Sequence, residues 1–334
     1  MRVAINGFGR IGRLVVRAAL KRNVSLDFAA VNDITDAKTL AHLMTYDSVH
    51  GAWPERFEAA DGALKIGGKT IRVLSELNPA SLPWKDLGVD VVLECTGKFT
   101  EREKAAAHLQ AGAKRVLVSA PAKGADATFV MGVNDKTFDP AKHTVVSIAS
   151  CTTNCLAPVA AVLDESFGIE RGLMTTIHAY TSDQRLHDAP HKDLRRARAA
   201  ALSMIPTSTG AAKAIGLVLP SLQGRLDGIS VRVPVANASV IDLTALVSRP
   251  ASAASVNQAM RAAAQGPLKG ILQYSEDPIV SQDIVGNPHS AVFDAPLTMV
   301  SGDRFVKVMA WYDNEWGFSN RMRDVALLVG RAFS

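Results

Sequence analysis

The sequence has little cysteine and no long apolar segment. Its three cysteines are an odd number without the spacing of a disulfide framework. Cys151 and Cys155 are four residues apart, which is not the C-x-x-C spacing of zinc or redox sites, so no metal site is expected. No apolar run approaches the ~20 residues needed to cross a bilayer, and polar residues interrupt the N-terminal stretch that a signal peptide would need. These absences predict a cytoplasmic protein in a reducing setting, without a membrane partner.

Charge of one sign is not in large excess either. The net charge is +5, with 21% charged and 48% hydrophobic residues, as in ordinary globular proteins. This mild basic excess suits anionic small molecules as well as nucleic acid. The basic segment 187–198 has no aromatic side chain to stack on bases, so nucleic-acid binding is not expected. A chain of 334 residues predicts two domains.

The first 33 residues follow the order of a dinucleotide-binding unit. Residues 2–6 predict a short buried strand, and the motif G-x-G-x-x-G of residues 7–12 comes next. Apolar residues at helical spacing follow, then a second strand at 26–31, and then Asp33. This order predicts a Rossmann-type βαβ unit. The alternative is a structural βαβ unit without a ligand.

Each residue of the motif has a physical reason to be there. Gly7 permits a tight turn, Gly9 lets the backbone approach a pyrophosphate, and Gly12 lets the helix pack closely on the strand. The pyrophosphate is expected at the positive end of the helix. Asp33 would accept hydrogen bonds from the adenosine ribose hydroxyls, and its charge would repel a 2′-phosphate.

The two halves of the chain show different patterns. Strands predicted at 89–94, 115–119 and 145–149 alternate with helices such as 101–111, which indicates a parallel sheet covered on both faces. Two residues after strand ends, Gly97 and Ser119, fall where such sheets bind ligands.

The second half contains long strand patterns at 172–180, 228–247 and 305–312. Ile229, Val231, Val233 and Val235 alternate with other residues, as in an exposed or one-sided sheet. We therefore predict an α/β protein with an N-terminal Rossmann domain, 1–149, and an α+β catalytic domain, 150–315, whose sheet is mostly antiparallel. A C-terminal helix within 316–334 is expected to pack back on the first domain.

Cys151 is a candidate nucleophile. It follows the apolar run 145–149 and precedes a predicted helix at 156–167, and N–H groups at a helix start lower the pKa of a thiol. The alternative is a small buried apolar residue, the usual role of a free cysteine. His178, near the end of a predicted strand, is a candidate base for the thiol, although a strand histidine is more often structural.

Basic and hydroxyl residues cluster after His178. Arginines with hydroxyls and backbone amides suit phosphate oxygens. The candidates are Thr181, Arg195, Arg196, Arg198, Thr207, Ser208, Thr209, Gly210 and Arg232. The alternative for the three arginines of 195–198 is a solvated loop that forms ion pairs with Asp188 and Asp193.

Four segments resemble phosphorylating glyceraldehyde-3-phosphate dehydrogenase. They are Asn6–Arg13, Ser150–Pro158, Ser208–Lys213 and Trp311–Trp316, and the resemblance runs nearly end to end. Residues 183–185 and 193–198 resemble the bacterial and plastid branch of that family.

The resemblance implies a reaction and its partners. It implies NAD-dependent oxidation and phosphorylation of D-glyceraldehyde 3-phosphate to 1,3-bisphosphoglycerate through a cysteine thioester, in glycolysis or gluconeogenesis, by a homotetramer. Cys151 would be the nucleophile and His178 its base. The NAD site would comprise Gly7, Gly9, Arg10, Ile11, Gly12, Asp33, Gly97, Ser119 and Asn314. The substrate's phosphate would be held by Thr181, Arg196 and Arg232, and inorganic phosphate by Ser150, Thr152, Thr209 and Gly210.

Three positions depart from the family's pattern. Leu77 stands where a basic residue is expected near adenosine, Phe318 where many members have tyrosine, and Ala189 where NAD-preferring members often have leucine. With Asp33 and Pro190 present, we expect strong NAD preference with detectable NADP use. The alternatives are a sister dehydrogenase that acts on erythrose 4-phosphate and a nucleotide-binding protein without catalysis.

Overall fold

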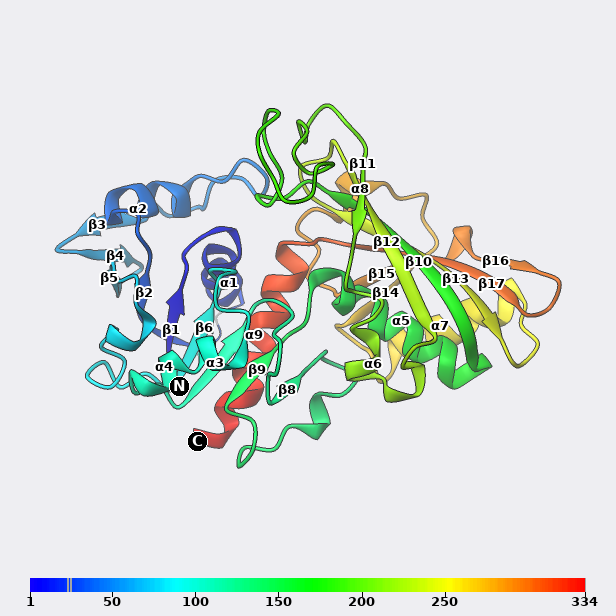
Figure 1. Cartoon of the computed structure of the whole chain (residues 1–334), viewed down its shortest axis with the longest axis horizontal. Coiled ribbons are helices and arrows are strands. Elements are labelled where there is room, and N and C mark those ends of the chain that lie inside the picture. Colours follow the sequence, from blue (N-terminus) through cyan, green and yellow to red (C-terminus); the bar gives the residue numbers. More distant parts are fainter. Residues whose placement is uncertain (23, 25, 334) are drawn as a thin grey trace. The chain divides into compact units, whose positions relative to one another are not determined.

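The computed structural model describes residues 1–22, 24 and 26–333 and contains two compact units (Figure 1). The first unit comprises residues 1–129, 135–149 and 319–334, and the second comprises 130–134 and 150–318. In the described part of the chain, no helix combines the length and the apolar character needed to cross a bilayer.

The first unit is built on a nine-stranded sheet with the order β3-β4-β5-β2-β1-β6-β7-β9-β8. From β5 to β8 all neighbouring strands are parallel, and β3, β4 and β5 form an antiparallel meander at one edge. The strands are β1 (Arg2–Asn6), β2 (Asp27–Asn32), β3 (Glu58–Ala60), β4 (Ala63–Ile66), β5 (Lys69–Leu74), β6 (Val91–Glu94), β7 (Arg115–Val118), β8 (Ala127–Thr128) and β9 (Val145–Ser147).

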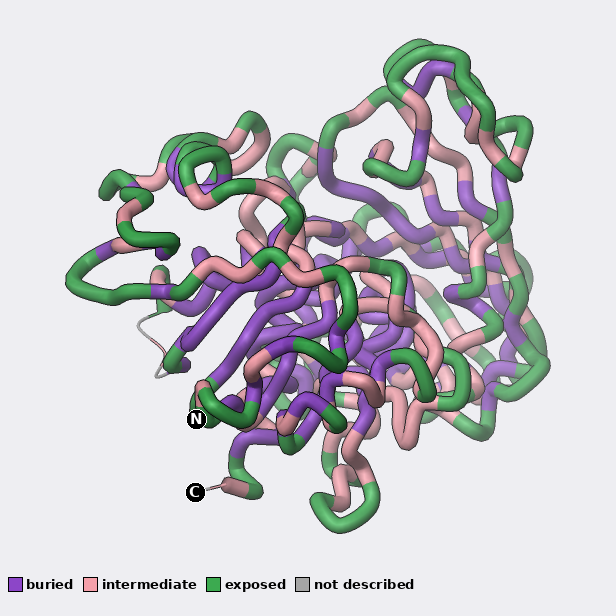
Figure 2. Tube along the Cα trace, turned by 60° about the vertical axis from the view of Figure 1, so that its left-hand side comes forward, coloured by how far each residue is buried: buried purple, intermediate pink, exposed green. Residues whose placement is uncertain are grey.

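Burial explains why these central strands lack a polar face. Every residue of β6 and β7 is buried, as expected for a parallel sheet covered on both faces. Figure 2 shows the buried strands at the centre of the unit and the exposed residues in the connecting loops. The helices of this unit are α1 (Arg10–Lys21), α2 (Ala37–Thr45), α3 (Arg102–Ala105), α4 (Ala107–Gln110) and most of α9 (Trp316–Gly330), with short 3₁₀ turns at Pro79–Ser81, Asp135–Thr137 and Arg331–Phe333.

The second unit is built on an eight-stranded sheet with the order β11-β12-β10-β13-β17-β15-β14, and β16 pairs with β17. Five of its strand pairs are antiparallel, while β10–β12 and β14–β15 are parallel. The strands are β10 (Ile169–Ala179), β11 (Ile205–Ser208), β12 (Leu226–Val233), β13 (Ser239–Val247), β14 (Leu272–Ser275), β15 (Ala291–Asp294), β16 (Met299–Ser301) and β17 (Phe305–Tyr312).

One long helix packs on this sheet. Helix α5 (Cys151–Phe167) packs against β10, β13, β15 and β17, and α7 (Ala253–Gln265) packs against α5. Shorter helical segments are α6 (Ile215–Val218), α8 (Ser281–Ile284) and the 3₁₀ turns Pro220–Leu222 and Ala295–Leu297.

The predicted fold class is confirmed: a Rossmann-type unit is followed by a unit with a mixed, mostly antiparallel sheet. Two element predictions were wrong. Residues 101–111 form two short helices, because Ala106 (φ −62°, ψ −14°) turns more tightly than an α-helix. Residues 228–247 form two strands, because the chain turns between Val233 and Ser239, where Ala238 has a positive φ of 70°.

Candidate active site

The start of α5 presents the candidate nucleophile. Cys151 is the first residue of the helix, and the Ser150 side chain caps it by accepting a hydrogen bond from the Thr153 N–H at 3.1 Å. The residue before the cap, Ala149, has a φ of +57°, a conformation that a residue with a Cβ adopts at a cost. A capped helix that follows a strained turn holds the thiol in one place.

The imidazole of His178 lies beside this thiol. Its Nε2 is 3.5 Å from the Cys151 Sγ, and its Nδ1 is 2.7 Å from the Ala179 carbonyl oxygen. A carbonyl oxygen can only accept, so we assign the ring proton to Nδ1. The lone pair of Nε2 then faces the thiol, which is the tautomer that a base requires.

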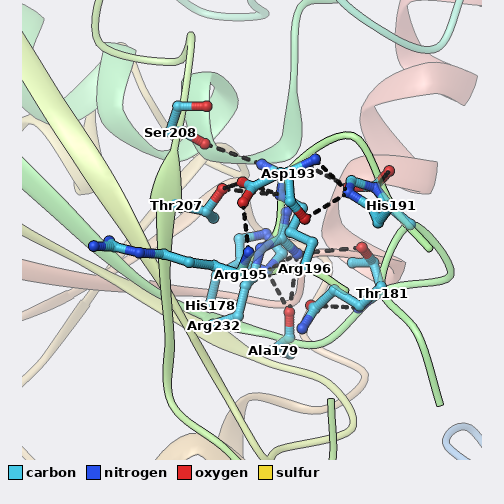
Figure 3. Close-up of polar contacts among 12 residues, drawn as sticks. His178, Ala179, Thr181, His191, Asp193, Arg195, Arg196, Thr207, Ser208 and Arg232 are labelled. Carbon is cyan, nitrogen blue, oxygen red and sulfur yellow. Dashed lines mark hydrogen bonds and ion pairs between the residues drawn. The ribbon is translucent and has the colours of Figure 1, made fainter. Parts of the chain in front are cut away.

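Arg232 completes the surroundings of the histidine. The two residues are register partners on the parallel strands β10 and β12. Its Nη1 donates to the Ala179 carbonyl at 3.1 Å and to the Thr181 hydroxyl at 3.2 Å (Figure 3). The same nitrogen is 3.1 Å from His178 Nδ1, a contact that is no hydrogen bond in the assigned tautomer. A cation therefore lies next to the His178–Cys151 pair.

Burial controls the ionisation of this pair. Burial, with the charge of Arg232 acting in the same direction, lowers the pKa of His178 to about 3. Burial also raises the pKa of the Cys151 thiol, whereas Arg232 and the N–H groups of Thr152 and Cys151 oppose that rise. The expectation of a lowered thiol pKa was therefore wrong, because loss of solvent outweighs the helix start. Cys151 as a residue is half-buried, while desolvation dominates at its thiol.

Arg196 lies in a dense polar cluster nearby (Figure 3). Its guanidinium donates to the Thr207 hydroxyl at 2.9 Å and to the Ser208 carbonyl at 3.1 Å, and it forms an ion pair with Asp183. Asp193 accepts from the same Thr207 hydroxyl at 2.5 Å. The side chain of Arg196 is largely buried and fixed, unlike that of Arg198, which pairs with Asp188 at the surface. The interpretation as a solvated loop therefore fits Arg198 but not Arg196.

The predicted inorganic-phosphate residues are only partly brought together. The Thr152 side chain is buried, and its hydroxyl lies 2.8 Å from the Tyr312 hydroxyl. Thr209 accepts a hydrogen bond from the Ala211 N–H, and the Thr153 hydroxyl is 3.5 Å from the Ala211 carbonyl. The loop that carries Thr209 and Gly210 therefore contacts the first turn of α5, while Thr152 faces the core.

The first unit contains a separate cavity of about 410 Å³ at the carboxyl ends of its parallel strands. Its lining includes Gly7, Gly9 and Asp33. The carboxylate of Asp33 accepts the Phe8 N–H at 2.8 Å and the Thr35 N–H at 3.0 Å. The cavity lies where open α/β sheets bind ligands.

The glycines of the motif have different structural roles. A Cβ on Gly12 would lie 2.4 Å from the Gly7 carbonyl oxygen, and a Cβ on Gly7 would lie 2.6 Å from the Thr96 nitrogen. Gly9 is the N-cap of α1, and it makes no side-chain cap hydrogen bond to the first turn of the helix. A helix start of this kind fits the pyrophosphate of a dinucleotide.

The remaining predicted cofactor residues are not part of the cavity lining, and their surroundings differ. Arg10 forms an ion pair with Asp47 at 2.5 Å, which helps to lower the Asp47 pKa to about 2 against the effect of burial. Ile11 is half-buried, Gly97 is exposed, and the Ser119 side chain forms a hydrogen bond with Cys95. Asn314 belongs to the second unit, where its side-chain oxygen accepts from the Ser239 hydroxyl at 3.0 Å.

Sequence reasoning missed three supporting residues of the second unit. Tyr312 lies 2.8 Å from both the Thr152 and the Thr176 hydroxyls, Ser239 accepts the Ala179 N–H, and Asp183 pairs with Arg196. Tyr312 lay within a motif already singled out, so it could have been found. Asp183 also lay within a segment already singled out, 183–185, but its contact with Arg196 depends on the folding of a loop. The contact between Ser239 and Ala179 joins positions far apart in the sequence and needed the register of β10 and β13.

Comparison with known families covers most of the chain. Residues 1–102 match the family model described as "Glyceraldehyde 3-phosphate dehydrogenase, NAD binding domain". Residues 150–314 match the model described as "Glyceraldehyde 3-phosphate dehydrogenase, C-terminal domain".

Curated relatives are similar over nearly their whole length. The chain is 58% identical over 330 residues to glyceraldehyde-3-phosphate dehydrogenase 2 of Streptomyces arenae. The aligned residues cover 99% of this chain and 98% of the relative. It is 59% identical over 330 residues to glyceraldehyde-3-phosphate dehydrogenase 1 of Streptomyces avermitilis, with the same coverage. It is 57% identical over 329 residues to glyceraldehyde-3-phosphate dehydrogenase of Geobacillus stearothermophilus, with 98% of each chain covered.

Proposed function

The chain belongs to the glyceraldehyde-3-phosphate dehydrogenase family, and from this membership we propose how its residues carry out the reaction. The protein is an NAD-dependent oxidoreductase that converts D-glyceraldehyde 3-phosphate and inorganic phosphate to 1,3-bisphosphoglycerate in glycolysis. The observation that best supports the assignment of residues is the 3.5 Å contact between Cys151 Sγ and His178 Nε2, with the ring proton on Nδ1.

We assign the covalent chemistry to this pair. His178 Nε2 takes the thiol proton, and the Cys151 sulfur bonds to the aldehyde carbon to give a thiohemiacetal. The Cys151 N–H, at the start of α5, stabilises the oxygen that becomes negative in this step. Bound NAD would supply the acceptor for the hydride that leaves this carbon. The remaining Cys151 thioester is attacked by inorganic phosphate, which forms the acyl phosphate and releases the thiolate.

We assign the phosphate of the aldehyde to Thr181, Arg196 and Arg232. The guanidiniums of Arg196 and Arg232 are desolvated, which strengthens their attraction for an anion. Arg196 is paired with Asp183, so a bound phosphate would share or displace that carboxylate. For inorganic phosphate we propose Ser150, Thr209 and Gly210. Thr152, whose hydroxyl faces Tyr312, would need to rotate or offer its backbone N–H.

The residues of the first unit fit the cofactor. Asp33 would hold the ribose hydroxyls, and the start of α1 would hold the pyrophosphate, with Gly7, Gly9 and Gly12 supplying the close approach. Arg10, Ile11, Gly97 and Ser119 are proposed to complete the site, and Asn314 to contact the cofactor from the catalytic domain. We keep 1–149 and 150–315 as the proposed domains, with the helix of 316–334 packed on the first.

We also propose a cytoplasmic homotetramer. Large apolar side chains are exposed along residues 186–204 and on β10, β12 and β17 of the second unit. A second copy of the chain would cover them.

Absorbance of NADH gives the test of function. Purified protein should reduce NAD rapidly with glyceraldehyde 3-phosphate plus inorganic phosphate, and slowly when phosphate is left out. Faster turnover of erythrose 4-phosphate, without a need for phosphate, would favour the sister dehydrogenase instead.

A further inference from the structure

A buried polar network lies beneath the cofactor cavity of the first unit. At its centre are Glu94, the last residue of β6, and His108 of α4, whose side chains are 1% and 0% exposed. Glu94 Oε2 is 3.0 Å from His108 Nε2. The Trp84 indole N–H donates to His108 Nδ1 at 3.0 Å from the opposite side. None of these three residues belongs to the glycine motif or to the thiol site.

The donors around the ring decide its tautomer. An indole N–H can only donate, so His108 Nδ1 must accept, and the proton of the neutral ring lies on Nε2. His108 therefore donates to the carboxylate of Glu94. The orientation of the ring is fixed at both nitrogens by groups that cannot reverse their roles.

Both oxygens of Glu94 are fully used. Oε2 also accepts from Asn6 Nδ2 at 2.6 Å, and Oε1 accepts from the Thr96 N–H at 2.8 Å and from the Thr96 hydroxyl at 2.5 Å. Four donors thus converge on one buried carboxylate. A buried polar group satisfied in this way rigidifies its surroundings, and one lost partner leaves another group unpaired.

The network continues to the residues that line the cavity. Asn32 donates to Asn6 Oδ1 at 2.7 Å and to the Glu76 carbonyl at 2.8 Å, while the Glu76 N–H donates back to Asn32 Oδ1 at 2.8 Å. Asn6, Asn32, Glu76 and Thr96 all line the cavity. The ends of β1, β2 and β6 and the segment after β5 are therefore held by one set of hydrogen bonds.

We propose that Glu94 and His108 are positioning residues for the dinucleotide: their buried hydrogen-bonded pair fixes Thr96 and Asn6, and through Asn6 it fixes Asn32, so that the strand ends keep the geometry that NAD requires. The inference rests on the assignment of this cavity to NAD. Gly7 and Thr96 lie so close that a Cβ on Gly7 would clash with the Thr96 nitrogen, whose N–H donates to Glu94. A shift of Thr96 would therefore be transmitted to the phosphate-binding turn.

Glu94→Gln provides the sharpest variant, because it keeps the shape but replaces one acceptor oxygen by a donor. In either orientation, the new NH₂ group faces at least one N–H donor: that of the Thr96 backbone, or those of the Asn6 amide and the His108 ring. We expect the dissociation constant and KM for NAD to rise about tenfold, as one buried donor loses its partner. The KM for glyceraldehyde 3-phosphate should stay within about twofold, since the residues of the network described above all belong to the first unit.

His108 gives a second, independent pair of variants. His108→Leu removes the donor to Glu94 and should weaken NAD binding in the same way. His108→Gln can return an amide donor to Glu94 and should recover most of the affinity. This pair carries the test if Glu94→Gln does not fold.

Val116→Ala is the matched control, because Val116 is buried on the neighbouring strand β7 and contacts an apolar cluster instead of the network. It should lower the melting temperature without changing NAD affinity, as measured by calorimetric titration. If Glu94→Gln and His108→Leu behave like Val116→Ala, the pair is only a core feature and the inference is overturned. If the wild type itself fails to bind NAD, the proposed cofactor site is lost, and this inference with it.

Discussion

At the residue scale, burial sets the state of the Cys151–His178 pair. Burial raises the pKa of the thiol and lowers that of the imidazole to about 3, so both favour the uncharged form. The nucleophile is then generated when the proton passes to Nε2, 3.5 Å away. Arg232 favours the thiolate that results, because it places a positive charge beside the pair.

Removal of the sulfur nucleophile should abolish oxidation. We expect Cys151→Ser to lose NADH formation while it retains NAD affinity, because the cavity of the first unit does not include Cys151. Cys155→Ala is the control, since its thiol is buried and lies 3.6 Å from the Ala310 carbonyl oxygen. Steady-state rates and calorimetric titration with NAD check both variants. Undiminished turnover in Cys151→Ser would contradict the assignment.

His178 should make stability depend on pH. In the unfolded chain the imidazole gains a proton below its ordinary pKa of 6.5, whereas in the folded chain it does so only near about 3. Between these values the unfolded state binds more protons, so stability falls as pH falls, by up to about 1.4 kcal/mol per pH unit. When the pH is lowered from about 7 to about 5, the free energy of unfolding of His178→Asn should therefore fall by about 2 kcal/mol less than that of the wild type. Urea unfolding at both pH values measures the difference, and parallel losses would show that His178 is protonated in the folded state.

The same variant tests the base. Without the imidazole nitrogen beside its sulfur, the Cys151 thiol should react more slowly with iodoacetamide at neutral pH. An unchanged alkylation rate would mean that the thiolate does not depend on His178.

Arg232 should discriminate between substrates. A charge-assisted contact to phosphate is worth about 1.5–3 kcal/mol, or roughly ten- to a hundredfold in kcat/KM. We expect Arg232→Ala to lose this factor toward glyceraldehyde 3-phosphate and little toward glyceraldehyde. An equal loss for both substrates would show that Arg232 acts by holding the Ala179 carbonyl and the Thr181 hydroxyl.

At the element scale, the contact between β1 and α1 leaves no room for a side chain at Gly12. The helix begins at Arg10, directly after the turn, and Gly12 faces the Gly7 carbonyl oxygen and the Ile5 side chain. Because a Cβ would not fit there, the glycine is required by packing, independently of any ligand.

This difference predicts opposite results for two glycines in one motif. Gly12→Ala should destabilise the protein by about 1–3 kcal/mol through overpacking. Gly9→Ala should leave stability nearly unchanged, since no heavy atom of the described residues lies within 4 Å of a Cβ built there and its φ is −73°. Melting temperatures compare the two, and equal values would show that the helix can shift to accept a methyl group.

At the scale of the whole molecule, the second unit carries apolar surface that a monomer would leave in water. Leu173 and Phe305 are 70% and 52% exposed, and both line a mostly apolar hollow of about 530 Å³ with Leu226 and Leu246. Exposed apolar patches of this kind mark association sites.

We therefore expect Leu173→Asp to weaken assembly. Light scattering should show a tetramer for the wild type and smaller species for the variant, because a charge would be buried against the partner's apolar surface. Glu170→Ala, a change at an exposed residue of the same strand, is the control. A stable, active wild-type monomer would remove the proposed tetramer.

The sequence by itself determined the class of the fold, because period and order are local properties. The strand at 2–6, the glycine motif and Asp33 predicted the Rossmann unit, and the pattern of residues 305–312 predicted a long strand. Residues 37–74, which form α2 and β3–β5, were not predicted, since their short segments are stabilised by their neighbours more than by their own pattern.

Tertiary structure decided what depends on residues distant in sequence. The direction of the thiol pKa could not be read from a helix start, because burial, which is set by the whole fold, outweighed it. The pairing of His178 with Arg232 came from the parallel register of β10 and β12, and that of Arg196 with Asp183 came from the folding of a loop. The Glu94–His108 pair joins a strand to a helix 14 residues later through a buried contact that spacing alone does not define. Residue types therefore supplied the chemistry, and packing decided which groups meet and in which protonation state.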